Sequence, residues 1–346
     1  MSTSAREAAR QIACLPSTSY CSSPSTSRNA VKEEPKTVLN KDFLDGILRS
    51  MVANCAIEDA RRMQVIHPIA ANAYKHAIRK HEHLRIEFHE PQNFRITGGK
   101  QVQLSPPIPN IAVQGTRCSS SSDALALVDS LLSSMTAITR ISLAMEDIEQ
   151  TIFASIMEKI IAAENVKLEV LQCTRRHAVI IPQLIDLIKA NASSLRIIGR
   201  IGVVEAARSF SDKMHLDRLS MMTFDMGFDD TNSSDIKDEM RTVMSSGATF
   251  EHLSYTSFAG FDPTEERMQV FLKKCGVKAL RLAMAHGPQI AQRPEGYPVS
   301  KVRGITHLEI GEVVEKPAHY NRLVVHEKIY KEVFPNAGHI TFFQSW

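Results

Sequence analysis

A short phrase that recurs along residues 138–310 constrains the fold most strongly. It has an apolar residue, two variable residues, Leu or Ile, one variable residue and a second apolar residue. The clear copies are Ile138-x-x-Ile141-x-Leu143, Leu216-x-x-Leu219-x-Met221, Phe250-x-x-Leu253-x-Tyr255, Val277-x-x-Leu280-x-Leu282 and Ile305-x-x-Leu308-x-Ile310. Looser copies, with Asn165 or Ala192 first, run through Leu168-x-Val170 and Leu195-x-Ile197. A period of about 20–50 residues predicts repeated units that each bury an apolar face against their neighbours.

The segments between the copies have the apolar spacing of helices. They cover residues 147–164, 182–190, 203–214, 236–244, 264–274 and 320–334, and residues 340–342 are expected to form a last strand. Strand and helix in alternation predict parallel strands joined by right-handed crossovers. Residues 282–305 are expected to form an irregular loop. The fold class is therefore α/β, with an irregular solenoid of parallel strands and helices over residues 131–346.

The first 130 residues divide into three parts. Residues 1–36 are rich in Ser, Thr, Pro and charge, which predicts a disordered tail. Residues 37–80 predict three short helices, near residues 39–51, 56–67 and 69–78. Residues 81–130 predict short strands around a Gly98-Gly99 turn, then a polar connector over residues 106–122 and a helix over 123–132.

Composition argues against several classes of protein. The 346 residues carry 41 basic and 38 acidic side chains, a net charge of +3, without a basic block, so nucleic acid is not an expected partner. No apolar run suits a secretory signal or a membrane span. Six scattered cysteines without a C-x-x-C motif indicate a reducing compartment, cytoplasm or nucleus, where buried cysteines act as small hydrophobes.

No enzymatic motif occurs: H-E-x-x-H, G-x-S-x-G, the Walker loop and the dinucleotide fingerprint are all missing. One cluster could suggest a metal site, and it comprises His81, His83 and His89 with Glu82, Glu87 and Glu90. Such a site needs a bend in the strand, and exposed histidine clusters are usually solvated. We therefore predict no catalytic residue, metal or cofactor.

The repeated phrase resembles the leucine-rich repeat, whose signature is L-x-x-L-x-L-x-x-N/C, over residues 138–313. Only Cys173 matches the final Asn or Cys of that signature. The equivalent residues in the other copies are Glu146, Arg200, Phe224, Phe258, Ala285 and Val313. Without a ladder of buried polar side chains, the turns must satisfy their backbone groups in another way. The resemblance therefore implies an irregular arc rather than a regular horseshoe.

The N-terminal helices resemble a divergent F-box, the module by which SCF ubiquitin-ligase receptors bind their adaptor. Phe43-Leu44 stands at the family's Glu-Leu-Leu, Ile47-Leu48 at its Ile-Leu and Ile57-Glu58-Asp59-Ala60 at its Pro-x-Asp-Leu, while Asn40 replaces the family proline. The implied adaptor-binding residues are Leu39, Phe43, Leu44, Ile47, Leu48, Met51 and Ile57. An internal core of the small bundle is the alternative role for these side chains.

A helical module followed by leucine-rich repeats is an order that many F-box receptors share, and the style of the chain is similar to nematode F-box families. The resemblance implies a non-catalytic substrate-recognition subunit, with the SCF adaptor, the cullin and a protein substrate as partners. The second hypothesis is a leucine-rich-repeat interaction scaffold without a ligase role, in which the N-terminal helices only cap the solenoid.

Residues beside each central Leu or Ile should point away from the core, because strand side chains alternate. The candidate substrate-binding residues on this concave face are Arg140, Lys167, Glu169, Arg196, Arg218, His252, Arg281, His307 and Glu309. Their basic lean favours an acidic or phosphorylated protein segment, since arginine forks match such groups. A solvated face without a ligand is the alternative.

Overall fold

The computed structural model describes residues 41–54, 57–97, 100–146, 148–175, 180–223, 232–257, 266–284, 301–313 and 327–345. The chain divides into two compact units, Met1–Ile78 and Arg79–Trp346. The expected disordered tail and most of the expected loop at 282–305 lie outside the described residues.

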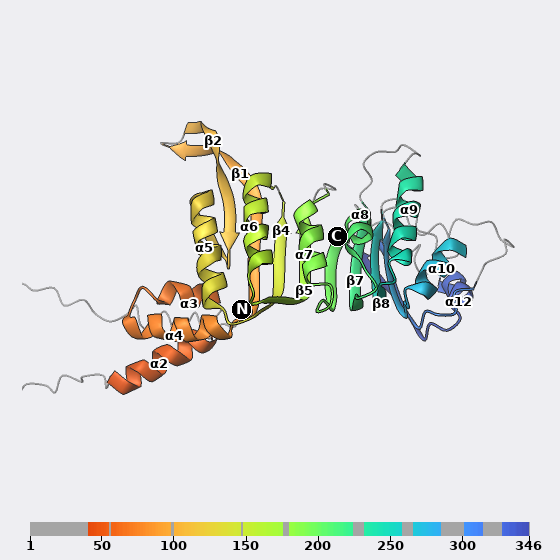
Figure 1. The fold of residues 1–346 in the computed structure, drawn as a ribbon, viewed down its shortest axis with the longest axis horizontal. Coiled ribbons are helices and arrows are strands. Elements are labelled where there is room, and N and C mark those ends of the chain that lie inside the picture. Colours follow the sequence, from red (N-terminus) through yellow and green to blue (C-terminus); the bar gives the residue numbers. More distant parts are fainter. Residues whose placement is uncertain are drawn as a thin grey trace, which may run out of the picture. The chain divides into compact units, whose positions relative to one another are not determined.

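The first unit contains the three expected helices, α2 (Lys41–Asn54), α3 (Ile57–Met63) and α4 (Pro68–Lys80) (Figure 1). Its small core is formed by the buried side chains of Val52, Ala60 and Ala73. The half-buried side chains that pack against this core are Ile57, Met63, Tyr74 and Ala77. Pro68 opens α4, where a missing N–H costs nothing, and His67 Nδ1 accepts the next N–H, from Ile69, at 3.2 Å.

The second unit is built on one sheet, of eleven strands among the described residues, in the order β11-β10-β9-β8-β7-β6-β5-β4-β1-β2-β3. The strands are β1 (His83–Thr97), β2 (Lys100–Val113), β3 (Thr116–Cys118), β4 (Ile138–Met145), β5 (Val166–Arg175), β6 (Ile197–Gly202), β7 (His215–Thr223), β8 (Thr249–Ser257), β9 (Ala279–Met284), β10 (His307–Val313) and β11 (His339–Ser345). From β4 to β11 each strand runs parallel to the next strand in the chain. The α/β class and the parallel strand order expected from the repeats are confirmed.

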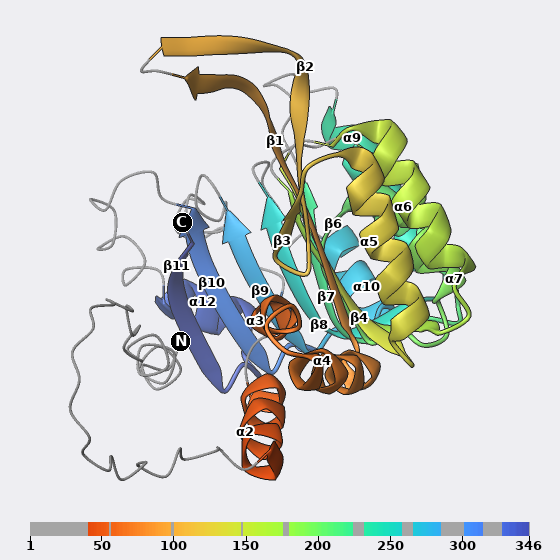
Figure 2. The same cartoon turned by 90° about the vertical axis from the view of Figure 1, so that its left-hand side faces the viewer.

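Helices connect these strands: α5 (Ser121–Ser134), α6 (Gln150–Ala162), α7 (Pro182–Ala190), α8 (Val203–Ser209), α9 (Asn232–Ser245), α10 (Glu266–Lys274) and α12 (Glu327–Val333). Figure 2 shows α5, α6 and α7 side by side along one face of the sheet. We call the opposite face the open face. Local signals set the helix starts: Ser120 Oγ accepts the Asp123 N–H at 3.1 Å, and Pro182 is the first residue of α7.

The repeated phrase supplies the core between the sheet and the helices. Strand register aligns the central residues of successive copies, which are all buried: Ile141, Leu171, Ile198, Leu219, Leu253, Leu280 and Leu308. The first residues are buried too: Ile138, Leu168, Leu195, Leu216, Phe250, Val277 and Ile305. Each unit thus fills its share of the core with residues spaced three and then two apart.

The alignment of the two looser copies was wrong by three residues. Leu171, not Leu168, pairs with Ile141, and Ile198, not Leu195, pairs with Leu171. Leu168 and Leu195 occupy the first position of the phrase, so these copies read Leu168-x-x-Leu171-x-Cys173 and Leu195-x-x-Ile198. An apolar residue at both 168 and 171 satisfies either alignment, and only pairing with the neighbouring strands chooses between them.

The expected connector at 106–122 was also wrong, because β2 continues to Val113, β3 follows, and α5 begins at Ser121. The prolines that suggested a loop fall where the pairing of β1 with β2 is irregular, between His89 and Phe94. Proline has no N–H to donate, so strands accept it at such irregularities.

Side-chain amides close several helix-to-strand turns in place of the missing asparagine ladder. Asn165 Nδ2 donates to the carbonyls of Leu132 and Met135, both at 2.8 Å. Asn191 Oδ1 accepts the Leu168 N–H at 2.9 Å, and its Nδ2 donates to Leu187 O at 3.0 Å. These bonds tie each turn to the neighbouring unit and satisfy groups that burial would otherwise leave unpaired.

Glu205 performs the same task with a carboxylate that is only 1% exposed. As the third residue of α8, it reaches back with Oε2 to the Gly202 N–H at 2.7 Å. Its Oε1 accepts the N–H of Ile181, just before α7, at 3.2 Å. One buried side chain therefore joins two consecutive units.

The end of α10 places a cysteine in the core. The Val277 N–H donates to Leu272 O at 2.9 Å and Gly276 adopts φ +74°, a helix ending that favours glycine. Cys275, immediately before, is buried, as are Cys118 and Cys173, and none of the three forms a disulfide within the described residues. Burial raises the pKa of the Cys275 thiol to about 12.

Replacing Glu205 by Ala should lower the free energy of unfolding by about 2–4 kcal/mol, because two backbone N–H groups lose their acceptor. The free energy of unfolding of Glu205→Gln, which keeps one carbonyl oxygen, should lie between those of wild type and Glu205→Ala. Glu158→Ala on the exposed side of α6 is the matched control and should change stability by less than about 0.5 kcal/mol. Urea unfolding measures all three; equal stability of Glu205→Ala and the control would contradict the bridging role.

The Cys275 thiol should resist alkylation in the folded protein at pH 9 and react once urea unfolds the chain. Because the folded chain holds this proton more tightly than the unfolded chain, the stabilisation is complete below about pH 9 and declines as the pH rises towards 12. Iodoacetamide labelling followed by mass spectrometry checks the first point. In Cys275→Ala, the free energy of unfolding should depend less on pH between about pH 9 and 12. An unchanged pH dependence would contradict this prediction.

Candidate functional site

The first candidate surface lies on α2, where Phe43 is 61% exposed and Ile47 36%. They lie four residues apart and so occupy neighbouring positions on one side of the helix. The core residue Val52 follows Phe43 by nine positions, roughly 180° around the helix at 3.6 residues per turn. Phe43 and Ile47 therefore face away from the core of the first unit.

The other predicted adaptor-binding residues differ in exposure. Leu48 and Met51 are half-buried, and Ile57 packs against the core cluster of Val52, Ala60 and Ala73. Leu39 and the side chain of Leu44 lie outside the described residues. The internal role thus fits Ile57, whereas Phe43 and Ile47 form an apolar surface that is exposed among the described residues of their unit.

The second candidate surface is the open face of the sheet. Register aligns one row of residues across it: His83, Arg140, Val170, Ile197, Arg218, His252, Ala279, His307 and His339. Paired residues of parallel strands point to the same side, opposite the buried residues that flank them. The row therefore carries arginine or histidine at its ends and on β7, β8 and β10, and apolar side chains at Val170, Ile197 and Ala279.

A hollow of about 420 Å³ opens over β6–β10, and we call it the basic hollow. Its charged and imidazole side chains are Arg200, Arg218, His252, Arg281, His307 and Glu309. Arg281 Nε lies 3.5 Å from Glu309 Oε2. Within the described residues, the side chains of Arg200 and Arg218 make no hydrogen bond or ion pair. Three guanidinium groups against one carboxylate suit an anionic group that accepts several hydrogen bonds.

Arg200 enters the hollow because of an irregularity in β6. Register is lost between Ile198 and Ile201, so that Gly199 and Arg200 lie opposite the single residue Ser220 of β7. Arg200 has φ +52°, a conformation that bulky side chains rarely adopt. Such bulges redirect a side chain. Arg200 was not among the predicted site residues, although a lone Gly199 inside a strand is a signal of a bulge.

The structure brings together five of the nine predicted substrate-binding residues, namely Arg218, His252, Arg281, His307 and Glu309. Arg140 is exposed on β4, three strands from Arg218 in the same row. Lys167, Glu169 and Arg196 are exposed but flank the first core position of their units rather than the central one, as a result of the shifted alignment. These four residues do not line the basic hollow.

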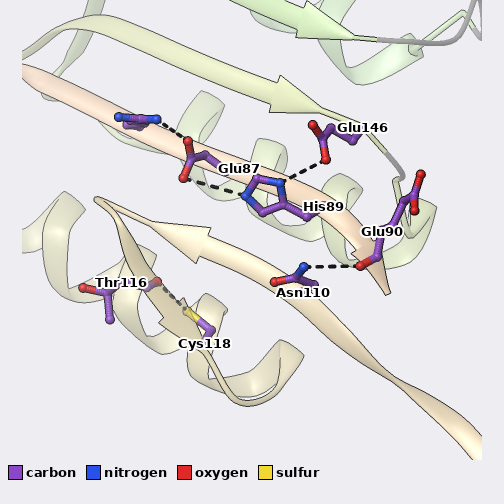
Figure 3. Close-up of polar contacts among 8 residues, drawn as sticks. Glu87, His89, Glu90, Asn110, Thr116, Cys118 and Glu146 are labelled. Carbon is purple, nitrogen blue, oxygen red and sulfur yellow. Dashed lines mark hydrogen bonds and ion pairs between the residues drawn. The ribbon is translucent and has the colours of Figure 1, made fainter. Parts of the chain in front are cut away.

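A second hollow, of about 260 Å³, lies over β1, β4 and β5, and several of its polar side chains pair with one another. His83 Nε2 lies 2.8 Å from Ser142 Oγ, and Arg85 pairs with Glu87. Figure 3 shows His89 between two carboxylates; its ring nitrogens lie 3.2 Å from Glu146 and 3.9 Å from Glu87. Mutual pairing leaves this region less able to bind an added ion than the basic hollow.

The histidines and glutamates of residues 81–90 do not come together as a metal site. Glu82 instead accepts a hydrogen bond from Thr139 Oγ1 at 3.1 Å. Across the described part of the chain, no group of three or more His, Cys, Asp or Glu is placed to hold a metal ion. In the same residues, no helix has both the length and the apolar character needed to cross a membrane.

A scan against protein-family models found no match for the chain, and a search of curated proteins found none either.

The exposure of Phe43 can be tested against the core residue on the same helix. Phe43→Ser should change the free energy of unfolding by less than about 0.5 kcal/mol, because the side chain has little contact to lose. Val52→Ala should cost about 1–3 kcal/mol through lost burial and a cavity. Thermal unfolding followed by circular dichroism compares them; an equal loss from both variants would assign Phe43 to the internal core.

Proposed function

We propose that this chain is the substrate-recognition subunit of an SCF-type ubiquitin ligase. Its N-terminal helices, as a divergent F-box, bind the adaptor that connects to the cullin. Its parallel sheet, as a degenerate leucine-rich-repeat domain, binds a protein substrate on the open face. The chain supplies no catalytic group; it accelerates ubiquitin transfer by holding a substrate lysine near the charged ubiquitin carrier.

The observation that carries this proposal is the exposed apolar pair of Phe43 and Ile47 on α2. A helix that presents apolar residues one turn apart is suited to lie in a groove of a partner. Burying a phenylalanine contributes about 1.5–3 kcal/mol, so the pair supplies a substantial part of a stable contact. Val65 and Ile66, in the turn after α3, add two more exposed apolar side chains to the same unit.

The second unit supports the substrate-binding half of the proposal. Its helices α5, α6 and α7 lie along one face of the sheet (Figure 2). Strand register places rows of charged and polar residues on the opposite face. The excess of arginine in the basic hollow favours an acidic or phosphorylated segment. Cysteines that act as small hydrophobes suit the cytoplasm or nucleus, the compartments we propose for the protein.

Co-purification of the full chain with the adaptor and cullin tests the proposal. Wild type should retain both partners, and Phe43→Asp combined with Ile47→Asp should lose them, because a buried charge in the contact is costly. Val270→Asp is the matched control, since Val270 is similarly exposed at 39% but lies on α10, and it should behave as wild type.

Two results would contradict parts of this reading. If the wild type retains neither partner, the ligase role is ruled out and the interaction scaffold becomes the supported function. Retention of both partners by the double variant shows that the ligase role does not depend on this face of α2.

A further inference from the structure

The strained backbone at Arg200 indicates that the basic hollow is shaped to bind a ligand. A non-glycine residue at φ +52° costs free energy, and such strain persists where the surroundings enforce it and often where a ligand is bound. Here the bulge adds a third arginine to a hollow that already contains Arg218 and Arg281. A regular β6 would pair Gly199 with Ser220 and Arg200 with Met221, whose side chain is buried in the core, so the bulge keeps this guanidinium off the core side.

The hollow favours a phosphate group over a single carboxylate. Arg281 already lies beside Glu309. Among the described residues, Arg200 and Arg218 are therefore the guanidinium groups of the hollow without an acceptor. A phosphate monoester offers three oxygens and close to two negative charges, enough for two arginine forks at once. Ser220, Ser254 and Thr256 in the lining can donate further hydrogen bonds.

The surface next to the hollow indicates what carries the phosphate. In the row that contains Arg218, the next two residues are Ile197 on β6 and Val170 on β5, both half-buried on the open face. Neighbouring strands lie about 4.8 Å apart, so these side chains lie about 5 and 10 Å from Arg218 across the sheet. An extended peptide, at about 3.3 Å per residue, covers this span in two or three residues.

We propose that the basic hollow binds a phosphorylated serine or threonine within an extended segment of the partner protein. The phosphate lies on Arg200 and Arg218, and an apolar side chain two or three residues away packs on Ile197 and Val170. Single-stranded nucleic acid fits less well, because the described lining of the hollow contains no Phe, Tyr or Trp side chain for base stacking. That this segment belongs to a ubiquitination substrate rests on the proposed function; the binding itself does not.

Fluorescence anisotropy with the full chain tests the proposal. The probe is a labelled nine-residue peptide with phosphoserine at the centre and leucine two positions to either side. It should bind at least about tenfold more tightly than its unphosphorylated form, and replacing both leucines by serine should weaken it several-fold. Arg218→Ala should weaken it by about tenfold or more, whereas Arg208→Ala, an exposed arginine on α8, should have no effect.

Arg200→Gly separates binding from folding. Glycine adopts positive φ freely, so the urea midpoint should stay unchanged or rise while the phosphopeptide affinity falls by about tenfold. If the urea midpoint and the phosphopeptide affinity both fall, Arg200 has a purely structural role and its part in binding is overturned.

Three outcomes overturn the proposal as a whole. They are equal affinity for the phosphorylated and unphosphorylated peptides, competition by inorganic phosphate as strong as that by the phosphopeptide, and binding of an oligouridine with the same dependence on Arg218. Adaptor co-purification is independent of these measurements. If the adaptor binds but the phosphopeptide does not, the proposed function stands without this site; the reverse result leaves the site without a ligase role.

Discussion

Burial of the three apolar residues of each copy of the repeated phrase is the constraint on which the second unit depends. In the first copy these are Ile138, Ile141 and Leu143, and the parallel register repeats the pattern copy by copy up to β10. Each such side chain contributes about 1.5–3 kcal/mol when fully buried. A slip of one residue would turn the whole set to the open face, so the core fixes the register and thereby the rows of polar residues opposite.

The backbone at the turns is the second requirement, and the chain meets it with several different side chains. Asn165 and Asn191 bond across successive units, while the buried Glu205 joins the start of α7 to the start of α8. A regular repeat would use one residue type at one position for this purpose. Varied solutions permit units of different length, which is consistent with the unequal spacing of the repeated phrase.

Sequence periodicity was sufficient for the helices and the parallel strand order, because both follow from local spacing, whereas it left the role of Phe43 open between a partner surface and an internal core. It failed where two local patterns fit equally well, as at Leu168 and Leu195, since pairing with neighbouring strands decides between them. It also failed at the prolines of β2, which the irregular pairing accommodates. The candidate site was predicted in part: alternation placed Arg218 and Arg281 on the open face, but the bulge that adds Arg200 depends on Ser220 of the adjacent strand.

The hairpin beside β4 limits how this architecture can vary. β1 runs parallel to β4 but antiparallel to β2, so the sheet changes its hydrogen-bonding pattern at that strand. A strand–helix unit added before β4 would have to separate β1 from β4 and break an established ladder. One added after β11 would meet the outermost of the described parallel strands and need displace none of them. Duplication of units during evolution would therefore lengthen the array in one direction, away from the hairpin.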